Sequence, residues 1–140
     1  MPPPDVRIAL GLLLRRSHQR AATALNDVLE PLGLTGRHFG VMLLLDREGV
    51  SSQRDLIRLT GSDKAGMART IADLEQLGYL KRSRSAEDRR VEDLSLTRSG
   101  ASAFGRAQEL ASSAATGLFD GFSETELANL ASLLRRFTER

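Results

Sequence analysis

The chain has 140 residues, 41% of them hydrophobic, which suits one compact folded subunit and argues against a disordered chain. It contains no cysteine, so disulfides, thiolate metal ligands and a cysteine-based redox switch are excluded. Its 20 basic and 18 acidic residues leave a net charge of only +2, so the bulk charge predicts no nucleic-acid partner.

The apolar run nearest the start of the chain, residues 8–14, is too short to span a bilayer. It also lacks the order of a basic segment followed by an apolar one that marks a signal peptide. We therefore expect a cytoplasmic protein that has no membrane partner.

A long first helix is predicted from about residue 6 to residue 30, because leucines and other apolar residues recur there at helical spacing. Pro31 and Gly33 should end it, since these residue types mark helix C-termini. Thr35 can cap a second helix, which we expect to run to about residue 47.

Two shorter helices are predicted next, and their spacing is informative. The segment Ser52–Asp55 has the pattern of a capping box, which would open a third helix. Thr60 and Gly61 form a tight turn, and Ser62 would cap a fourth helix that ends near Gly78. Helices joined by about three residues including a glycine are typical of a helix-turn-helix, whose second helix enters the major groove of DNA.

A hairpin follows, with predicted strands over residues 79–85 and 91–97 around a charged loop. Residues 81–90 hold five basic and two acidic side chains, a local charge of +3 that exceeds the charge of the whole chain. Basic density at a turn favours contact with nucleic acid. A hairpin directly after a helix-turn-helix predicts the wing of a winged helix.

Two further helices complete the layout. Thr97 would cap a fifth helix that runs to about residue 119. Ser123 begins a second capping-box pattern, which leads into a last helix with one apolar stripe. The predicted fold is mainly α with a small β-hairpin wing, a winged helix-turn-helix with long terminal helices.

The fourth helix has a buried and an outward face when successive residues are placed about 100° apart. Met67 and Ile71 belong to the buried stripe, whereas Ala65 and Arg69 lie opposite it. Small side chains let a helix sit deep in the groove, and an arginine can bond guanine or phosphate. The alternative for Lys64 and Arg69, that they are ordinary solvated charges, is disfavoured by the adjoining basic hairpin.

Arg90 is the wing residue that we most expect to contact DNA, because an arginine at a narrow loop tip can enter the minor groove. Asp88 can orient its guanidinium through a bidentate pair. For Asp88 alone, the alternative is a surface salt bridge worth about 0–1 kcal/mol.

Three segments resemble the MarR family of bacterial regulators. Residues 62–80, with a leucine, a glutamate and a terminal glycine, resemble the family's recognition helix. The Asp-Arg-Arg run at 88–90 and the Leu-Ser-Leu-Thr-Arg-Ser-Gly run at 94–100 resemble its wing and the start of its next helix. The six-helix layout also agrees, so the resemblance covers nearly the whole chain.

The resemblance implies a homodimeric repressor that a small molecule, such as an aromatic acid, releases from a pseudo-palindromic operator. Residues 1–32 and 99–140 would form the dimerisation helices, and residues 33–98 the DNA-binding domain. The terminal helices carry apolar stripes that a thin monomer would leave exposed, which agrees with a dimer. The candidate DNA-binding residues are Ser52, Gln53, Ser62, Lys64, Ala65, Arg69, Arg84, Asp88, Arg89 and Arg90.

A small-molecule effector would bind between the dimer helices and the winged domain, as it does in similar proteins. Arg15, His18, His38 and Met42 lie on the helices that would border such a cleft. Each has a structural alternative: Met42 as a core residue, Arg15 as a solvated or interface charge, and the histidines as satisfied structural residues.

Two other classes of protein are alternatives. An enzyme is disfavoured, because two histidines without a carboxylate cluster form no recognisable zinc site and the chain has no phosphate-binding glycine motif or nucleophile elbow. We therefore expect no catalytic residues, no metal and no cofactor. A winged-helix module that binds a protein partner is the second alternative, and weak salt dependence of binding would distinguish it from DNA binding.

Overall fold

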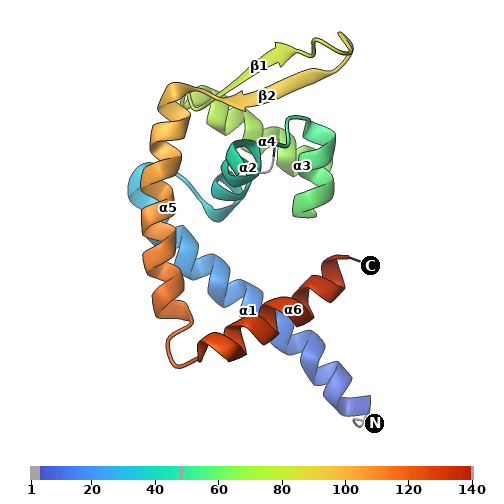
Figure 1. Ribbon diagram of the computed structural model, residues 1–140, viewed down its shortest axis with the longest axis vertical. Helices are drawn as coiled ribbons and strands as arrows, with labels where there is room; N and C mark the ends of the chain where they lie inside the picture. Colours follow the sequence, from blue (N-terminus) through green and yellow to red (C-terminus); the bar gives the residue numbers. More distant parts are fainter. Residues whose placement is uncertain (1–3, 48, 140) are drawn as a thin grey trace.

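The computed structural model describes residues 4–47 and 49–139, and in them it confirms a mainly α fold with one hairpin (Figure 1). In chain order the elements are α1 (Pro4–Leu29), the short 3₁₀ helix η1 (Glu30–Leu32), α2 (Gly36–Arg47), α3 (Gln53–Thr60), α4 (Lys64–Gln76), β1 (Leu80–Arg84), β2 (Glu92–Leu96), α5 (Arg98–Leu118) and α6 (Glu124–Thr138). The predicted boundaries agree to within a few residues.

The molecule has a winged-helix body at one end and terminal helices at the other (Figure 1). Helices α2, α3 and α4 pack on one another, and the hairpin projects from them away from the N-terminus. Helix α5 links the two ends because it packs on α2 and β2 near its start and along α1 further on. Within the described residues, α6 makes no extensive contact with another element.

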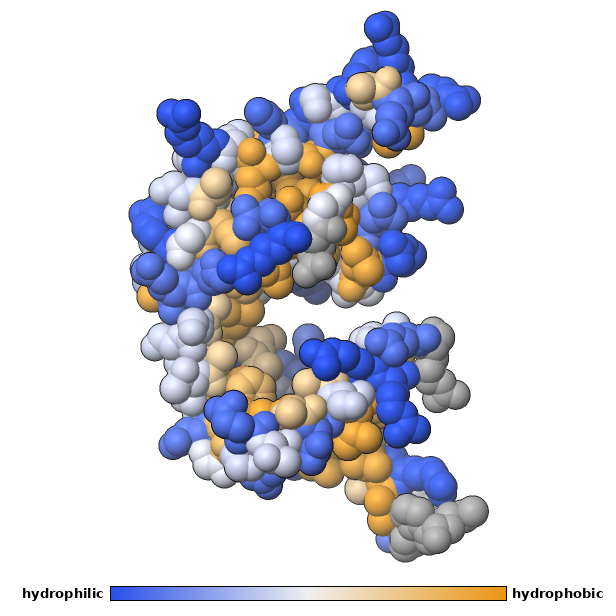
Figure 2. Space-filling model, viewed as in Figure 1, coloured by the Kyte–Doolittle hydropathy of each residue, from blue (hydrophilic) through white to orange (hydrophobic). Residues whose placement is uncertain are grey.

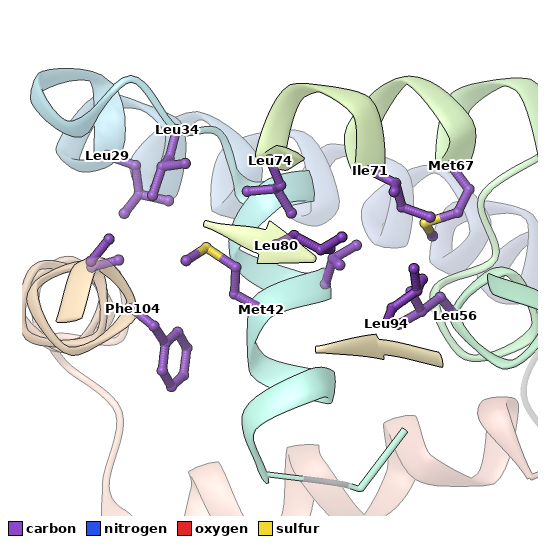
Figure 3. Close-up of a cluster of buried hydrophobic side chains, with 13 residues drawn as sticks. Leu29, Leu34, Met42, Leu56, Met67, Ile71, Leu74, Leu80, Leu94 and Phe104 are labelled. Carbon is purple, nitrogen blue, oxygen red and sulfur yellow. The ribbon is translucent and has the colours of Figure 1, made fainter. Parts of the chain in front are cut away.

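The hydrophobic core lies in the winged-helix body, where α2, α3, α4, the hairpin and α5 converge (Figure 3). Met42 and Leu74 are fully buried at its centre. The rings of Phe39 and Phe104 stack with their centroids 5.5 Å apart, which fastens α2 to α5. The buried hydrophobic residues are Leu29, Leu34, Val41, Met42, Leu56, Met67, Ile71, Leu74, Leu80, Leu94, Ala103, Phe104 and Ala107.

The helix starts follow the predicted caps at three positions and differ from them at two, Ser62 and Thr35. Ser52 and Thr97 accept hydrogen bonds from the third backbone amide beyond them, and Ser123 forms a complete capping box with Glu126. The expectation that Ser62 caps α4 is wrong, because Asp63 does so: its Oδ1 accepts from the amide of Gly66 at 2.6 Å. A carboxylate is the better acceptor there, since it also interacts favourably with the positive end of the helix.

Thr35 stands at the predicted start of α2, but its hydroxyl does not bond a backbone amide of that helix. Its Oγ1 lies 3.0 Å from Nδ1 of His38, and its own backbone N–H donates to the same nitrogen at 2.9 Å. The amide of Gly36 is instead satisfied by Oδ1 of Asn26 on α1, at 2.7 Å. The start of α2 is thus held from two directions, by α1 and by His38.

The root of the hairpin is packed against the start of α5. Thr97 donates from its hydroxyl to the carbonyl of Gly78 at 2.6 Å and from its backbone amide to that of Tyr79 at 3.0 Å. Gly100 faces the same carbonyl so closely that a Cβ there would lie 2.0 Å from the Tyr79 oxygen. Only glycine fits at this crossing.

Apolar side chains are exposed along both terminal helices, and Figure 2 shows them as a hydrophobic surface over α1 and α6. The exposed residues are Val6, Ile8, Leu10, Leu12, Leu13 and Leu14 on α1, and Leu130, Leu133, Leu134 and Phe137 on α6. None of the described helices is long and apolar enough to cross a membrane. A continuous exposed apolar surface along two helices is of the kind that marks an interaction site.

Candidate nucleic-acid interface and ligand cleft

Helix α4 has the two faces that its sequence predicts. Met67, Ile71 and Leu74 are buried against α2 and α3, whereas Ala65 and Arg69 are exposed on the opposite side. Small residues dominate the outward face near its start, because Ala68 is exposed beside Ala65. An exposed helix face of small residues with one long cation can approach the floor of a major groove.

The starts of α3 and α4 present groups suited to phosphate. Ser52 Oγ accepts from the amide of Asp55 at 3.1 Å, so its O–H remains able to donate. Gln53 is half-buried at the first position of α3, and Ser62 is half-buried just before α4. Lys64 is exposed at the first position of α4. Amides, hydroxyls and a cation at helix N-termini are a favourable setting for an anion.

The wing tip is built around Asp88 and Arg90. Arg90 donates from Nε to Oδ1 of Asp88 at 3.2 Å, from Nη2 to Oδ2 at 3.4 Å, and from its backbone amide to Oδ1 at 3.0 Å. These bonds lower the pKa of the Asp88 carboxyl, which keeps it ionised. The bond from the backbone amide of Arg90 has the larger effect and the bond from its side chain the smaller one. The Arg90 side chain is nonetheless 91% exposed, so it is oriented but available.

The other two predicted wing arginines differ in role. Arg84 donates from Nη1 to the carbonyl oxygen of Arg89 at 2.8 Å, which closes the loop across the hairpin. The side chain of Arg89 is exposed and makes no hydrogen bond or ion pair with the described residues. Arg84 therefore braces the tip, while Arg89 and Arg90 project from it.

Sequence reasoning did not single out Arg82, which has the most ion-pair contacts of any described cation. Its Nη2 and Nε donate to Oε1 of Glu75 on α4 at 2.8 and 3.0 Å, and its Nη1 donates to Oε2 of Glu92 on β2 at 3.0 Å. These hydrogen bonds, to Glu75 first and Glu92 second, raise the pKa of the Arg82 guanidinium. The strand register was the available signal, because it places Arg82 across from Leu94 and two pairs away from Glu92, on the same face of the hairpin.

A cleft of about 780 Å³ lies between α1, α2 and the helix-turn-helix. Of the four effector candidates, His18 lines it. Arg15 is exposed on α1, Met42 is fully buried in the core, and neither borders the cleft. The lining residues are His18, Ala21, Ala22, Leu25, Asn26, Thr35, Gly36, Arg37, Gly40, Val41, Thr60, Gly61, Ser62, Met67 and Thr70.

His38 lies behind the cleft wall and connects α2 to α4. Its Nε2 is 3.0 Å from Oδ2 of Asp73, while its Nδ1 accepts from the backbone amide of Thr35. This pattern fits the neutral tautomer with its proton on Nε2. Arg37, which the sequence reasoning passed over, borders the cleft and has no ion-pair partner among the described residues.

The described part of the chain contains no group of three His, Asp or Glu side chains placed to hold a metal ion. The distinctive surfaces among the described residues are the outward face of α4, the wing tip and the cleft. A helix-turn-helix followed directly by an antiparallel hairpin defines a winged-helix protein.

Comparison with known proteins agrees with this class. Residues 32–91 match the MarR family. The HTH-type transcriptional repressor NicR of Pseudomonas putida is 32% identical over 99 residues, which are 71% of this chain but only 63% of NicR, less than two thirds of that protein's length. Over residues 32–91 the chain therefore resembles the MarR family, and its relative NicR is a transcriptional repressor.

Two solved structures extend the likeness to nearly the full chain. A MarR-family transcriptional regulator from Rhodococcus sp. RHA1 has a TM-score of 0.87 at 23% identity, covering 97% of this chain and 96% of that one. BpsR of Bordetella bronchiseptica, whose DNA binding is regulated by 6-hydroxynicotinic acid, has a TM-score of 0.82 at 27% identity, covering 93% and 98%. The winged-helix fold with terminal helices is therefore shared over nearly the whole chain.

Proposed function

We propose that this protein is a sequence-specific DNA-binding transcriptional regulator. The observation that carries the proposal is the exposed Arg90, held by both carboxylate oxygens of Asp88 at the tip of a hairpin that follows a helix-turn-helix. The repressor NicR and the DNA-binding regulator BpsR support it as relatives of the same fold. In this proposal, release of the protein from its operator controls transcription from a promoter. The protein would need no cofactor for this.

The candidate contacts divide by the part of DNA that each can reach. Ser52, Gln53, Ser62 and Lys64 would hold phosphates, which sets the register of the protein on the duplex. Ala65 and Arg69 would meet base edges in the major groove, where an arginine can discriminate guanine. Arg84, Asp88, Arg89 and Arg90 would form the wing's contact with the minor groove and its phosphates, with Arg84 and Asp88 acting through the loop.

We expect Arg69→Ala and Arg90→Ala each to weaken operator binding by about 1–3 kcal/mol without unfolding the protein. Both side chains are exposed, so their removal leaves the core intact. The test is a titration of DNA selected from the source genome, monitored by fluorescence anisotropy at several salt concentrations. Log affinity of the wild type should fall with log salt by about 0.9 for each phosphate neutralised.

Arg47→Ala is the matched control, because it removes an exposed arginine from the end of α2, outside the helix-turn-helix, the wing and the terminal helices. Wild-type affinity in both test variants would contradict the assignment of the two arginines. A wild-type protein that binds no genomic fragment, or binds with a flat salt dependence, would contradict DNA regulation and favour a protein-binding winged helix.

We further propose that the protein is a homodimer whose interface is formed by residues 1–32 and 99–140, with residues 33–98 as the DNA-binding domain. The exposed apolar stripes of α1 and α6 support this, because a second copy would cover them. A two-fold dimer presents two copies of α4, so its operator would be pseudo-palindromic.

The effector is proposed to be a small aromatic acid that binds in the cleft and lowers DNA affinity. His18 and the backbone at Gly36 border the space, and Arg37 supplies a cation for a carboxylate. BpsR responds to 6-hydroxynicotinic acid, which makes that compound the natural first probe. His38 would act from behind the wall, whereas Arg15 and Met42 remain candidates only if the partner or a rearrangement brings them to the cleft.

Arg37→Ala should raise the concentration of 6-hydroxynicotinic acid needed for half-release of DNA by about tenfold or more, since a charge-assisted bond to the carboxylate is lost. The variant should still bind operator like the wild type. Arg20→Ala is the control, because Arg20 lies on α1 in a groove beside α5 rather than in the cleft. An unchanged release curve for Arg37→Ala would contradict this site for the acid.

A further inference from the structure

The wing has little apolar attachment beyond its root. Leu80 and Leu94 are buried, but the rest of β1 is exposed, and Figure 1 shows the hairpin projecting from the body. A two-stranded hairpin is marginally stable on its own, so its outer part needs another contact to hold a fixed direction. The orientation of the wing tip must therefore come from polar contacts.

Arg82 supplies that contact to helix α4. Among the described residues, it is the one hairpin side chain with hydrogen bonds to α4, through two bonds to Oε1 of Glu75. Its third bond, to Glu92, ties the two strands to the same point. On the other side of the hairpin, the Leu94 amide donates to the Ser51 carbonyl at 2.7 Å and Ser51 Oγ donates to Oδ1 of Asp93 at 3.4 Å, which holds β2 toward the start of α3.

The position of Arg82 along the strand makes it effective. The register pairs it with Leu94, the last buried residue of β2 toward the tip, so Arg82 stands where the core ends. Arg84 lies two residues further out, about 7 Å along the strand, and braces the loop that carries Arg90. A small rotation at Arg82 would thus become a larger displacement at Arg90.

We propose that Arg82 is a positioning residue that fixes the angle between the wing and helix α4, so that both engage one operator half-site together. The inference rests on the proposed DNA-binding function. Arg82 acts through Arg90 and does not itself contact DNA, because its donors are already bonded to two carboxylates. These pairs are partly exposed and stabilise the fold little, so their effect is on geometry.

The test is a double-mutant cycle between Arg82→Ala and Arg90→Ala, with operator affinity as the readout. Each single variant should bind about tenfold more weakly than the wild type, and the double variant should bind no more weakly than Arg90→Ala alone. If Arg82 contacts DNA directly, the two losses will multiply to about a hundredfold, and the proposal is overturned. Urea unfolding should show nearly equal stability for all four proteins.

Two further variants separate geometry from charge. Arg82→Lys keeps the charge but not the planar fork, so it should bind nearly as weakly as Arg82→Ala. Wild-type affinity in Arg82→Lys would show that a positive charge at this position is enough for DNA binding, and would overturn the proposed role of the guanidinium geometry. Glu75→Ala should weaken binding, whereas its control Glu87→Ala, which removes a carboxylate from the wing loop outside this network, should not. If Glu75→Ala and Glu87→Ala both bound DNA more tightly by the same factor, only the loss of negative charge would matter, and the proposal would be contradicted.

A measurement without DNA completes the test. In Arg82→Ala, NMR order parameters of the amides in residues 84–91 should fall from about 0.85 toward about 0.6, while those of α4 stay unchanged. Rigid wing amides in that variant would overturn the proposal even if DNA binding falls. A wild-type protein that binds no DNA contradicts the proposed function instead, so the two failures are distinguishable.

Discussion

Gly100→Ala is expected to lower the free energy of unfolding by about 3 kcal/mol, among the largest effects of any single methyl group in this chain. The added Cβ would lie 2.0 Å from the carbonyl oxygen of Tyr79 and 2.8 Å from its carbonyl carbon. Both are backbone atoms, so no side chain can move aside. The start of α5 would have to separate from the root of the wing, where Thr97 bonds Gly78 and Tyr79.

Gly105→Ala provides the control in the same helix. Nothing lies within 4 Å of a Cβ at Gly105, which is an exposed interior position of α5. Alanine is favoured over glycine by about 0.5–1 kcal/mol in such a position, so this variant should be more stable than the wild type. Urea titrations followed by circular dichroism measure both. Equal stability of the two variants would contradict the close packing at the wing root.

Leu133→Glu is expected to convert the proposed dimer into monomers. Leu133 is 53% exposed in the single chain and lies in the apolar stripe of α6 with Leu130, Leu134 and Phe137. A two-fold interface contains each substitution twice, and burial of a leucine is worth about 1.5–3 kcal/mol, so at least about 3 kcal/mol of association energy is lost. The dimer dissociation constant should rise by more than about a hundredfold, measured by sedimentation equilibrium.

Ser132→Glu is the matched control, because it adds the same charge to the exposed opposite side of α6. It should remain dimeric. Operator binding should weaken with dimer loss, since a monomer reads one half-site. A Leu133→Glu protein that stays dimeric at micromolar concentration would place the interface elsewhere.

The layout of the fold follows from local signals in the sequence. The caps at Ser52, Thr97 and Ser123 and the glycines after η1 and α3 have strong conformational preferences that few alternatives satisfy. The buried stripe of α4 was predicted because helical periodicity alone decides which side faces the core. The Ser62 and Asp63 positions show the limit, since adjacent residues are both good caps and only the path of the turn selects one.

The contacts that join distant segments could not be predicted in the same way. The sequence analysis counted Arg82 with the basic residues of the wing. Its partner Glu75 lies on α4, and the contact between the two exists only once the hairpin has packed beside that helix. The pair of Asp88 and Arg90 was predicted, since the two residues lie within one loop. The cleft depends on how α1 approaches the helix-turn-helix, which explains why Arg37 was missed while His18 was included.

One wall of the cleft is the turn of the helix-turn-helix itself, formed by Thr60, Gly61 and Ser62. A small molecule there and a DNA phosphate at the start of α4 would meet at the same hydroxyl, that of Ser62. Binding of the small molecule and binding of DNA would then be coupled directly at Ser62, and no conformational change in the core would be needed. Thermodynamic linkage requires the reciprocal effect, so operator DNA would lower the affinity for the small molecule by the same factor.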